Sequence, residues 1–104
     1  MSYHLRFLQE IEEDAIAGYR WYEEKAKGLG EEFLRVFYAG TEQVLENPMA
    51  YARGFDDFRR YLLRRYPYAI YYQIEGNQVI IFGLFHCARD PRTIKSKLQG
   101  RGGN

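Results

Sequence analysis

The sequence has little of what builds disulfides, membrane spans or secretion signals. Cys87 is the only cysteine, so no disulfide can form within the chain. The longest apolar run, residues 79–85, is far shorter than the ~20 residues of a membrane-spanning helix. No charged segment followed by an apolar one opens the sequence. We therefore expect a cytoplasmic protein with no membrane partner.

Metal ligands are equally scarce. Structural zinc sites use four nitrogen or sulfur ligands, whereas His4, His86 and Cys87 are the whole supply of these side chains. Two of the three are also neighbours, and neighbours in a strand point to opposite faces of a sheet. The sequence has no glycine-rich phosphate-binding loop either. We predict neither a metal nor a cofactor.

What the chain has in quantity is aromatic and charged side chains. Its 104 residues are 46% apolar and include ten Tyr, which is typical of a single globular domain. Residues 1–50 carry five basic and ten acidic residues, whereas residues 51–104 carry ten basic and four acidic ones. The second half is therefore expected to meet a nucleic acid or an acidic protein, unless the two halves neutralise each other within the fold.

Hydrophobic spacing predicts a strand followed by a helical hairpin. Residues 3–8 alternate polar and apolar side chains, as a half-buried strand does. Apolar residues then recur at helical spacing in two segments separated by Gly28 and Gly30. They are Ile11, Ala15, Tyr19, Tyr22 and Ala26 in the first segment, and Phe33, Phe37, Gly40 and Val44 in the second. Asn47-Pro48 ends the second helix, and residues 49–57 predict an irregular surface connection.

Residues 58–86 have the pattern of a three-stranded β meander. The strands are expected at 58–65, 68–74 and 79–86, and Gly76-Asn77 predicts a two-residue hairpin loop. Continued without interruption, that hairpin pairs Tyr72 with Ile81, Tyr71 with Phe82 and Tyr68 with Phe85. It places His86 opposite Pro67, on the face of Ala69 and Tyr71 and near Arg64, Arg65 and Tyr66. Cys87 then points the other way, as a small buried apolar side chain.

Residues 85–91, FHCARDP, combine the rarest side chains of the chain at the end of the last strand. We expect residues 1–92 to form one domain and residues 93–104 a basic tail, partly helical through Leu98 and disordered beyond it. RNA cleavage by the substrate's 2′-hydroxyl needs an acid, a base and cations. His86 could transfer the proton and Arg64, Arg65 or Arg89 hold the phosphate. The alternative is that these residues only end a strand and pair locally.

The order of strand, helical hairpin and Arg-rich meander resembles the RelE/ParE superfamily of bacterial toxins. The resemblance covers residues 3–92. It is carried by YRWYEEKAKGLGEEFLRVF in the hairpin, LENP at its end, RRYLLRRYPYAIYYQIEGNQVIIFGLFH in the sheet, and HCARDP. It implies an α+β fold in which an N-terminal strand and a helical hairpin pack with a small, mostly antiparallel sheet ending in the meander.

The resemblance also implies the toxin component of a type II toxin–antitoxin system. The strand ending in LFH, with Asp90 after His86, is similar to the His-x-x-x-Asp ending of ParE proteins. ParE-like members inhibit DNA gyrase and are neutralised by a cognate antitoxin, with a dimer expected within the complex. The alternatives are a RelE-like endoribonuclease that cuts mRNA on the ribosome with His86, Arg65 and Arg89, or a detoxified relative. The nucleic-acid or partner-binding candidates are Arg59, Arg60, Arg64, Tyr66, Tyr71 and Arg92.

Overall fold

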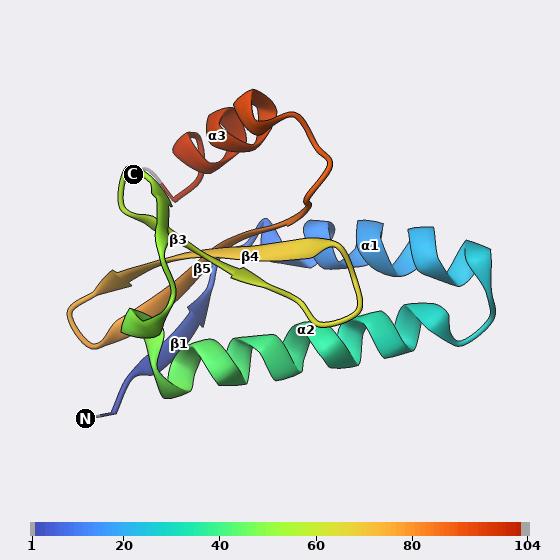
Figure 1. The fold of residues 1–104 in the computed structure, drawn as a ribbon, viewed down its shortest axis with the longest axis horizontal. Coiled ribbons are helices and arrows are strands. Elements are labelled where there is room, and N and C mark those ends of the chain that lie inside the picture. Colours follow the sequence, from blue (N-terminus) through green and yellow to red (C-terminus); the bar gives the residue numbers. More distant parts are fainter. Residues whose placement is uncertain (1, 103–104) are drawn as a thin grey trace.

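The computed structural model describes residues 2–102 and contains one five-stranded sheet and three α-helices (Figure 1). The strands are β1 (His4–Phe7), β2 (Arg53–Phe55), β3 (Phe58–Leu62), β4 (Tyr68–Glu75) and β5 (Gln78–His86). The helices are α1 (Ile11–Lys25), α2 (Leu29–Glu46) and α3 (Pro91–Gln99), with a 3-10 turn η1 (Pro48–Ala50) after α2. None of these helices is long and apolar enough to cross a membrane.

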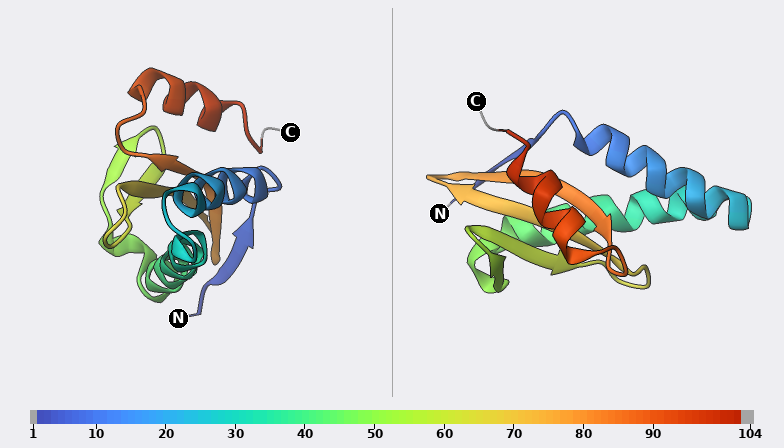
Figure 2. Two further views of the ribbon diagram at one scale, coloured as in Figure 1. Left: turned by 90° about the vertical axis from the view of Figure 1, so that its right-hand side faces the viewer. Right: turned by 90° about the horizontal axis from the view of Figure 1, so that it is seen from above.

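The sheet has the order β1-β5-β4-β3-β2, with β1 parallel to β5 and the other neighbours antiparallel. The hairpin of α1 and α2 covers one face, and α3 lies on the opposite face (Figure 2). This arrangement confirms the predicted α+β class, the helical hairpin and the C-terminal meander. Phe33 and Phe37 are fully buried between α2 and the sheet, whereas Ile94 and Leu98 bury the inner side of α3.

The turn between α1 and α2 is closed by one carboxylate. Gly28 has a φ of 88°, a left-handed conformation that glycine adopts without strain. The side chain of Glu23 accepts hydrogen bonds from the backbone N–H of Gly28 at 3.0 Å and of Gly30 at 2.9 Å. These bonds lower the pKa of the Glu23 carboxyl below its ordinary value. The two predicted glycines therefore act with Glu23 as one turn.

The connection between α2 and β3 is more ordered than predicted. Residues 49–57 contain η1 and the edge strand β2, and β2 is only three residues long and has an irregular register with β3. Arg59 holds the segment, because its Nη1 donates to the carbonyl oxygen of Tyr51 at 2.7 Å. A strand so short shows no alternation in the sequence, which is why the expectation of an irregular connection was wrong for residues 53–55.

A β-bulge changes the register of the β4–β5 hairpin. The Gly76-Asn77 loop and the pairing of Tyr72 with Ile81 agree with the prediction, but beyond them Tyr71 pairs with Gly83 and Tyr68 with His86. The predicted pairs Tyr71–Phe82 and Tyr68–Phe85 were therefore wrong. An extra residue in one strand turns every following side chain to the other face. Residues 79–85 are all apolar or Gly, so their pattern could not reveal it.

The C-terminal segment belongs to the same packed structure. Helix α3 begins at Pro91, before the expected boundary at residue 92, and the carboxylate of Asp90 caps it by accepting from the N–H of Arg92 at 2.9 Å. Helix formation through Leu98 agrees with the expectation. Arg101 is fixed rather than disordered, whereas the expectation of disorder for residues 103–104 lies outside the described residues.

Arg101 and Asp14 complete the edge of β5 where β1 has ended. Strand β1 pairs with β5 only as far as Ile81. Beyond that point the carboxylate of Asp14 accepts from the N–H of Leu84 at 3.1 Å, and Arg101 Nη1 donates to the carbonyl oxygen of Phe82 at 2.9 Å. The two side chains also form a two-bond ion pair, with distances of 2.6 and 3.0 Å. They join α1, β5 and the segment after α3.

Candidate functional site

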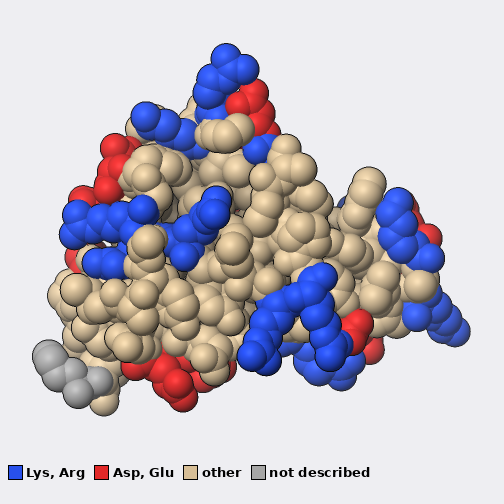
Figure 3. Space-filling view, viewed as in Figure 1, with Lys and Arg blue, Asp and Glu red and all other residues tan. Residues whose placement is uncertain are grey.

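A groove on the α3 side of the sheet gathers most of the candidate residues. It has a volume of about 620 Å³ and lies between β2 and β3 on one side and the segment from Cys87 into α3 on the other. Its basic lining residues are Arg53, Arg60, Arg89, Arg92 and Lys95, and its apolar lining includes Phe55, Leu62, Tyr71 and Ile94. We call this surface the cationic groove. In Figure 3, blue side chains lie over α3 at the top and toward β2 at the left, with uncharged surface between them.

The charge of the cationic groove is largely uncompensated. Arg92 pairs with Asp90, its N-cap neighbour, at 3.1 Å. Within residues 2–102, no carboxylate lies within ion-pair distance of Arg53, Arg60, Arg89 or Lys95. None of the residues that line the groove is acidic. Several like charges around a concave surface concentrate a positive potential there, and such a potential attracts anionic groups.

The floor of the groove is apolar and mostly aliphatic. Leu62 of β3 is 54% exposed. Tyr71 is only 5% exposed, since it packs against Phe85 with ring centroids 6.0 Å apart. Ile94 closes the floor from α3. The groove therefore combines a ring of cations with an apolar base in which Leu62 is exposed and Tyr71 and Ile94 are buried.

The structure brings only some of the predicted site residues into this groove. Arg60, Tyr71, Arg89 and Arg92 are there. Arg53, Cys87 and Lys95 also line the groove, although they were not predicted as site residues. Arg53 lies in a segment without hydrophobic periodicity, and Lys95 lies in the segment that was expected to be a tail. The excess of basic residues after position 50 was the one sequence signal that included both. Arg59 does not line the groove, and its side chain donates a hydrogen bond to the carbonyl oxygen of Tyr51.

The bulge exchanges the expected positions of His86 and Cys87. Cys87 is exposed and lines the groove, so the expectation that it is buried was wrong. His86 lies on the other face, where its ring packs against Tyr68 at 5.2 Å between centroids. Its Nδ1 accepts from the N–H of Ala88 at 3.0 Å, which leaves Nε2 as the proton-bearing atom of the neutral ring. Trp21 and Arg89 line the same shallow hollow as His86.

The turn between β3 and β4 directs its arginines to α2 rather than to His86. Arg65 pairs with Glu32 at 3.1 Å, and both side chains are well exposed. The hydroxyl of Tyr66 donates to the same carboxylate at 2.7 Å. Burial, together with this bond to Glu32, raises the pKa of Tyr66 to about 12. With Tyr66 only 7% exposed, its ring cannot stack on a base. Arg64 lies on the α2 side as well.

The catalytic arrangement envisaged from the sequence is therefore not assembled. His86 and Arg89 share the hollow beside α1, but Arg65 is tied to α2. The cationic groove contains no His, Asp or Glu among its lining residues, and its tyrosine is buried. Within residues 2–102, no three His, Cys, Asp or Glu side chains come together as metal ligands would. The groove offers charge and apolar contact rather than proton transfer.

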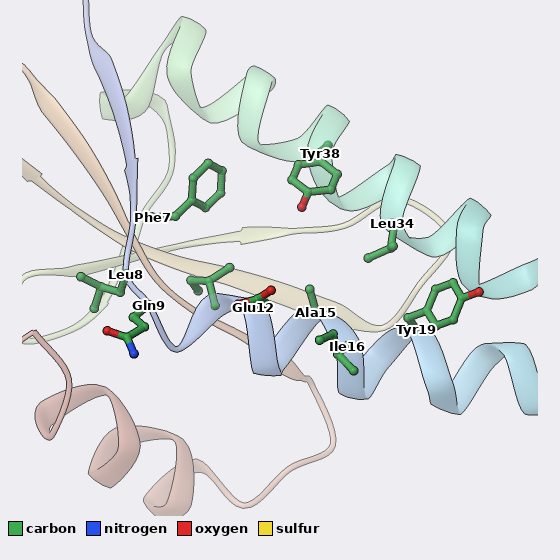
Figure 4. A pocket seen from close by; sticks show the side chains of 10 residues that line it. Phe7, Leu8, Gln9, Glu12, Ala15, Ile16, Tyr19, Leu34 and Tyr38 are labelled. Atoms are coloured by element: carbon green, nitrogen blue, oxygen red, sulfur yellow. The ribbon is translucent and has the colours of Figure 1, made fainter.

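A second groove lies between the two helices of the hairpin and the end of β1 (Figure 4). Its volume is about 650 Å³. Phe7, Ile16 and Tyr38 line it and are between 40% and 52% exposed, and Glu12 is its one charged lining residue. This hairpin groove therefore offers a mainly apolar surface to a partner.

Comparisons with known proteins agree with this architecture. Residues 5–91 match the family described as ParE toxin of type II toxin-antitoxin system, parDE. Toxin ParE2 of Mycobacterium tuberculosis is 24% identical over 102 residues, which are 97% of each chain. A structure of the chromosomal ParDE system from P. aeruginosa has a TM-score of 0.74 at 13% identity, covering 82% of this chain and 96% of that one.

The fold is shared with RelE toxins as well. A mutant of the E. coli toxin RelE, solved in complex with a peptide of the antitoxin RelBc, has a TM-score of 0.58 and 22% identity. The alignment covers 93% of this chain and 94% of that one.

Proposed function

The chain belongs to the ParE toxin family of type II toxin–antitoxin systems, and on this premise we propose that it binds and inhibits DNA gyrase and is neutralised by a cognate antitoxin. The relatives support the antitoxin as a partner, because one similar structure is of a ParDE system and another holds an antitoxin peptide. Inhibition by binding needs a partner surface and no reaction at the toxin.

The observation that carries the proposal is the composition of the cationic groove. Arg60 and Arg89 can hold carboxylates or phosphates, and the exposed Leu62 adds an apolar contact. Cleavage of RNA would also need a general base and a general acid near the phosphate. The lining residues supply cations but no His or carboxylate. This composition supports binding of a macromolecule in preference to catalysis.

One observation favours a second candidate function, ribosome-dependent cleavage of mRNA. His86 and Arg89 line a common hollow, and the exposed Trp21 lies beside them. A histidine can transfer a proton near neutral pH, an arginine can bind phosphate, and an exposed indole can stack on a base. The hollow is shallow and shares only Arg89 with the cationic groove, so this activity would not use Arg53, Arg60 or Lys95.

Two assays with the purified chain separate the candidates. We expect the protein to inhibit ATP-dependent supercoiling of relaxed plasmid by gyrase, while mRNA on translating ribosomes stays intact. The His86→Ala variant should inhibit gyrase as well as the parent does, because His86 lies outside the cationic groove. Ribosome-dependent cleavage that is lost in His86→Ala, with gyrase unaffected by the parent protein, would establish the second candidate instead.

A further inference from the structure

We propose that a pocket between α2 and the β3–β4 turn, which we call the α2 pocket, binds the phosphodiester backbone of duplex DNA. The α2 pocket has a volume of about 360 Å³ and shares no lining residue with the cationic groove. The inference rests on the proposed function only in taking DNA, on which gyrase acts, as the nucleic acid. It adds a second contact, made with the DNA rather than with the enzyme.

Four side chains that can donate hydrogen bonds surround the α2 pocket. They provide the guanidinium groups of Arg64 and Arg65, the hydroxyl of Tyr61 and the amide of Gln43. In protein–DNA complexes, Arg, Tyr and Gln are among the side chains that donate to phosphate oxygens. Within residues 2–102, no carboxylate lies within ion-pair distance of Arg64, and no acidic residue lines the pocket. This set of donors favours an anion with several acceptor oxygens.

The two arginines lie on a turn that is held in place before any ligand binds. The N–H of Leu63 donates to the carbonyl oxygen of Tyr68 at 2.9 Å, which closes the turn. The buried Tyr66 fixes the turn to α2 through its 2.7 Å bond to Glu32. Glu32 also accepts from Nη1 of Arg65 at 3.1 Å, which leaves Nε and Nη2 of Arg65 able to donate to another acceptor. A preformed arrangement of this kind lowers the entropic cost of binding.

The backbone at Arg65 is strained. Its φ is 69°, a left-handed conformation that is uncommon for residues other than glycine. This conformation is unfavourable for a residue with a Cβ, and residues held in it cluster at functional sites. A glycine would close the same turn with less strain but would provide no guanidinium group. The arginine at this position therefore contributes its charge rather than a suitable backbone preference.

Tyr61 of β3 places a hydroxyl beside Arg64. Burial raises the pKa of Tyr61 and the neighbouring Tyr51 raises it further, whereas the positive charge of Arg64 lowers it. The hydroxyl therefore stays protonated near neutral pH and can donate to a phosphate oxygen next to the guanidinium group. The ring is held edge-on against Tyr51 with centroids 5.0 Å apart. A Cβ built on Gly40 of α2 would lie 2.9 Å from Cε2 of Tyr61, so the absence of a side chain there leaves room for the ring.

A duplex fits the α2 pocket better than a single strand or a protein does. Single-stranded nucleic acids are usually held by exposed rings on which bases stack. The one ring among the lining residues, that of Tyr61, is half-buried and packs on Tyr51. The central part of a protein interface is mainly apolar, but none of the exposed large apolar side chains of residues 2–102 lines this pocket. The contacts that remain are to phosphate and are independent of the base sequence.

The α2 pocket and the cationic groove lie on opposite faces of the sheet. Arg60 and Tyr61 are neighbours in β3, so their side chains point to opposite faces. Arg60 lines the cationic groove, whereas Tyr61 lines the α2 pocket. In Figure 3, blue side chains gather below the centre, over α2 and the β3–β4 turn. The chain can therefore contact a protein with one face while the other contacts DNA.

The salt dependence of DNA binding tests the site. Fluorescence anisotropy of a short labelled duplex is measured with the purified chain at several salt concentrations. Each phosphate that a cation contacts contributes about −0.9 to the slope of the logarithm of the binding constant against the logarithm of the salt concentration. We expect Arg64→Gln to weaken binding about tenfold at low salt and to make this slope less negative by about 1.

Two variants at other basic positions serve as controls. Arg60→Gln in the cationic groove and Arg20→Gln at an exposed position of α1 should each change the affinity for the duplex by less than about twofold. An equal loss in Arg64→Gln and Arg60→Gln would mean that the cationic groove binds the DNA and would overturn the proposal. Unchanged binding by Arg64→Gln would overturn it as well.

Arg65→Asn separates binding from folding. Asparagine adopts the left-handed conformation more readily than arginine does, so this variant should melt no lower than the parent, although it binds the duplex more weakly. Circular dichroism measures the melting temperature of each variant. If binding weakens only in variants that melt at a lower temperature, the arginines have a structural role and the proposal is wrong.

Competitors identify the ligand. An RNA duplex of the same sequence and poly-glutamate are measured beside the DNA duplex. Binding that depends on Arg64 for RNA but not for DNA would overturn the proposal, as would displacement of the DNA by poly-glutamate at an equal concentration of charge. These measurements contain no gyrase, so their failure and a failure of gyrase inhibition are separate results.

Discussion

At the scale of single residues, the pair of Asp14 and Arg101 takes the place of a longer β1. It satisfies a backbone N–H and a carbonyl of β5 that no strand reaches, and it joins α1 to the segment after α3. Removing one member of a buried ion pair leaves the other charge unpaired, at a cost of about 3 to 5 kcal/mol. Neither residue stood out in the sequence, because Asp14 is one of several acids in its helix and Arg101 lies in a Gly-rich end.

We therefore expect Arg101→Leu to lower the free energy of unfolding by about 3 kcal/mol in urea titrations. The matched control is Arg92→Leu, since Arg92 also pairs with an aspartate but its side chain is 92% exposed. Exposed pairs contribute about 0 to 1 kcal/mol, so this variant should be close to the parent. Equal stability of the two variants would contradict the structural role assigned to Arg101.

Tyr66 predicts how the stability of the fold depends on alkaline pH. Its pKa is about 12 in the folded protein, against an ordinary value of 10.0, because burial and the bond to Glu32 disfavour the phenolate. The contribution of the protonated Tyr66 to the stability of the fold is therefore complete below pH 10, and it is lost as the pH rises from 10 toward 12. Burial also raises the pKa of Tyr72 to about 12, so its contribution to stability is lost over the same pH interval.

Each of these tyrosines should contribute a loss of about 2 to 3 kcal/mol over that interval. We expect Tyr66→Phe to be less stable than the parent at pH 8, where it lacks the bond to Glu32, but to lose less stability than the parent between pH 10 and pH 12, because no phenol titrates at position 66. Denaturant titrations at the three pH values measure both effects. An identical alkaline loss in the two proteins would show that Tyr66 is not responsible.

At the scale of elements, the close packing of α1 on α2 requires a glycine at position 18. A Cβ built on Gly18 would lie 2.5 Å from Cε2 of Phe33, whose ring is fully buried. Alanine favours helices over glycine by about 1 kcal/mol, but overpacking a core costs about 1 to 3 kcal/mol. We expect Gly18→Ala to lower the melting temperature, and Gly54→Ala, whose Cβ meets only the carbonyl oxygen of Phe58 at 4.0 Å, to leave it nearly unchanged. A more stable Gly18→Ala variant would contradict this packing.

The elements that could be predicted from the sequence are those with a long, regular pattern. Helix α2 shows its face in Phe33, Phe37, Gly40 and Val44, all of which are buried. The strands of the meander and the Gly76-Asn77 loop follow from local chemistry in the same way. Strand β2 and the bulge at Phe82 could not be predicted, since both arise from pairing with neighbouring strands. The bulge alone determines which of His86 and Cys87 enters the groove.

At the scale of the whole molecule, the cationic groove joins segments that are far apart in the sequence. The uneven distribution of charge predicted an anionic partner for the second half of the chain, unless the two halves neutralise each other. Among residues 2–102, the cations that line the groove include four from the second half that form no ion pair. Which cations meet there depends on β2 and on the packing of α3 against β5, neither of which has a sequence signal of its own. Arg60, Arg89 and Arg92 were foreseen as candidates, but Arg53 and Lys95 were not.

The groove also distinguishes the two ways in which toxins of this fold could act. A binding surface needs complementary charge and apolar area, whereas a nuclease needs proton transfer at a phosphate. In the groove, Arg60 and Lys95 supply charge and Leu62 supplies apolar area. The remaining candidate for proton transfer, His86, lies on the other face of the sheet. The central claim is therefore that the chain acts by binding its target.

Gyrase supercoiling in the presence of the purified chain tests this claim most directly. Relaxed plasmid, gyrase and ATP are combined with increasing amounts of the protein, with and without an equimolar amount of the cognate antitoxin. We predict that supercoiling is inhibited by the free protein and restored when the antitoxin is present. Full supercoiling at every concentration of a correctly folded protein that still stops growth on expression would contradict the account.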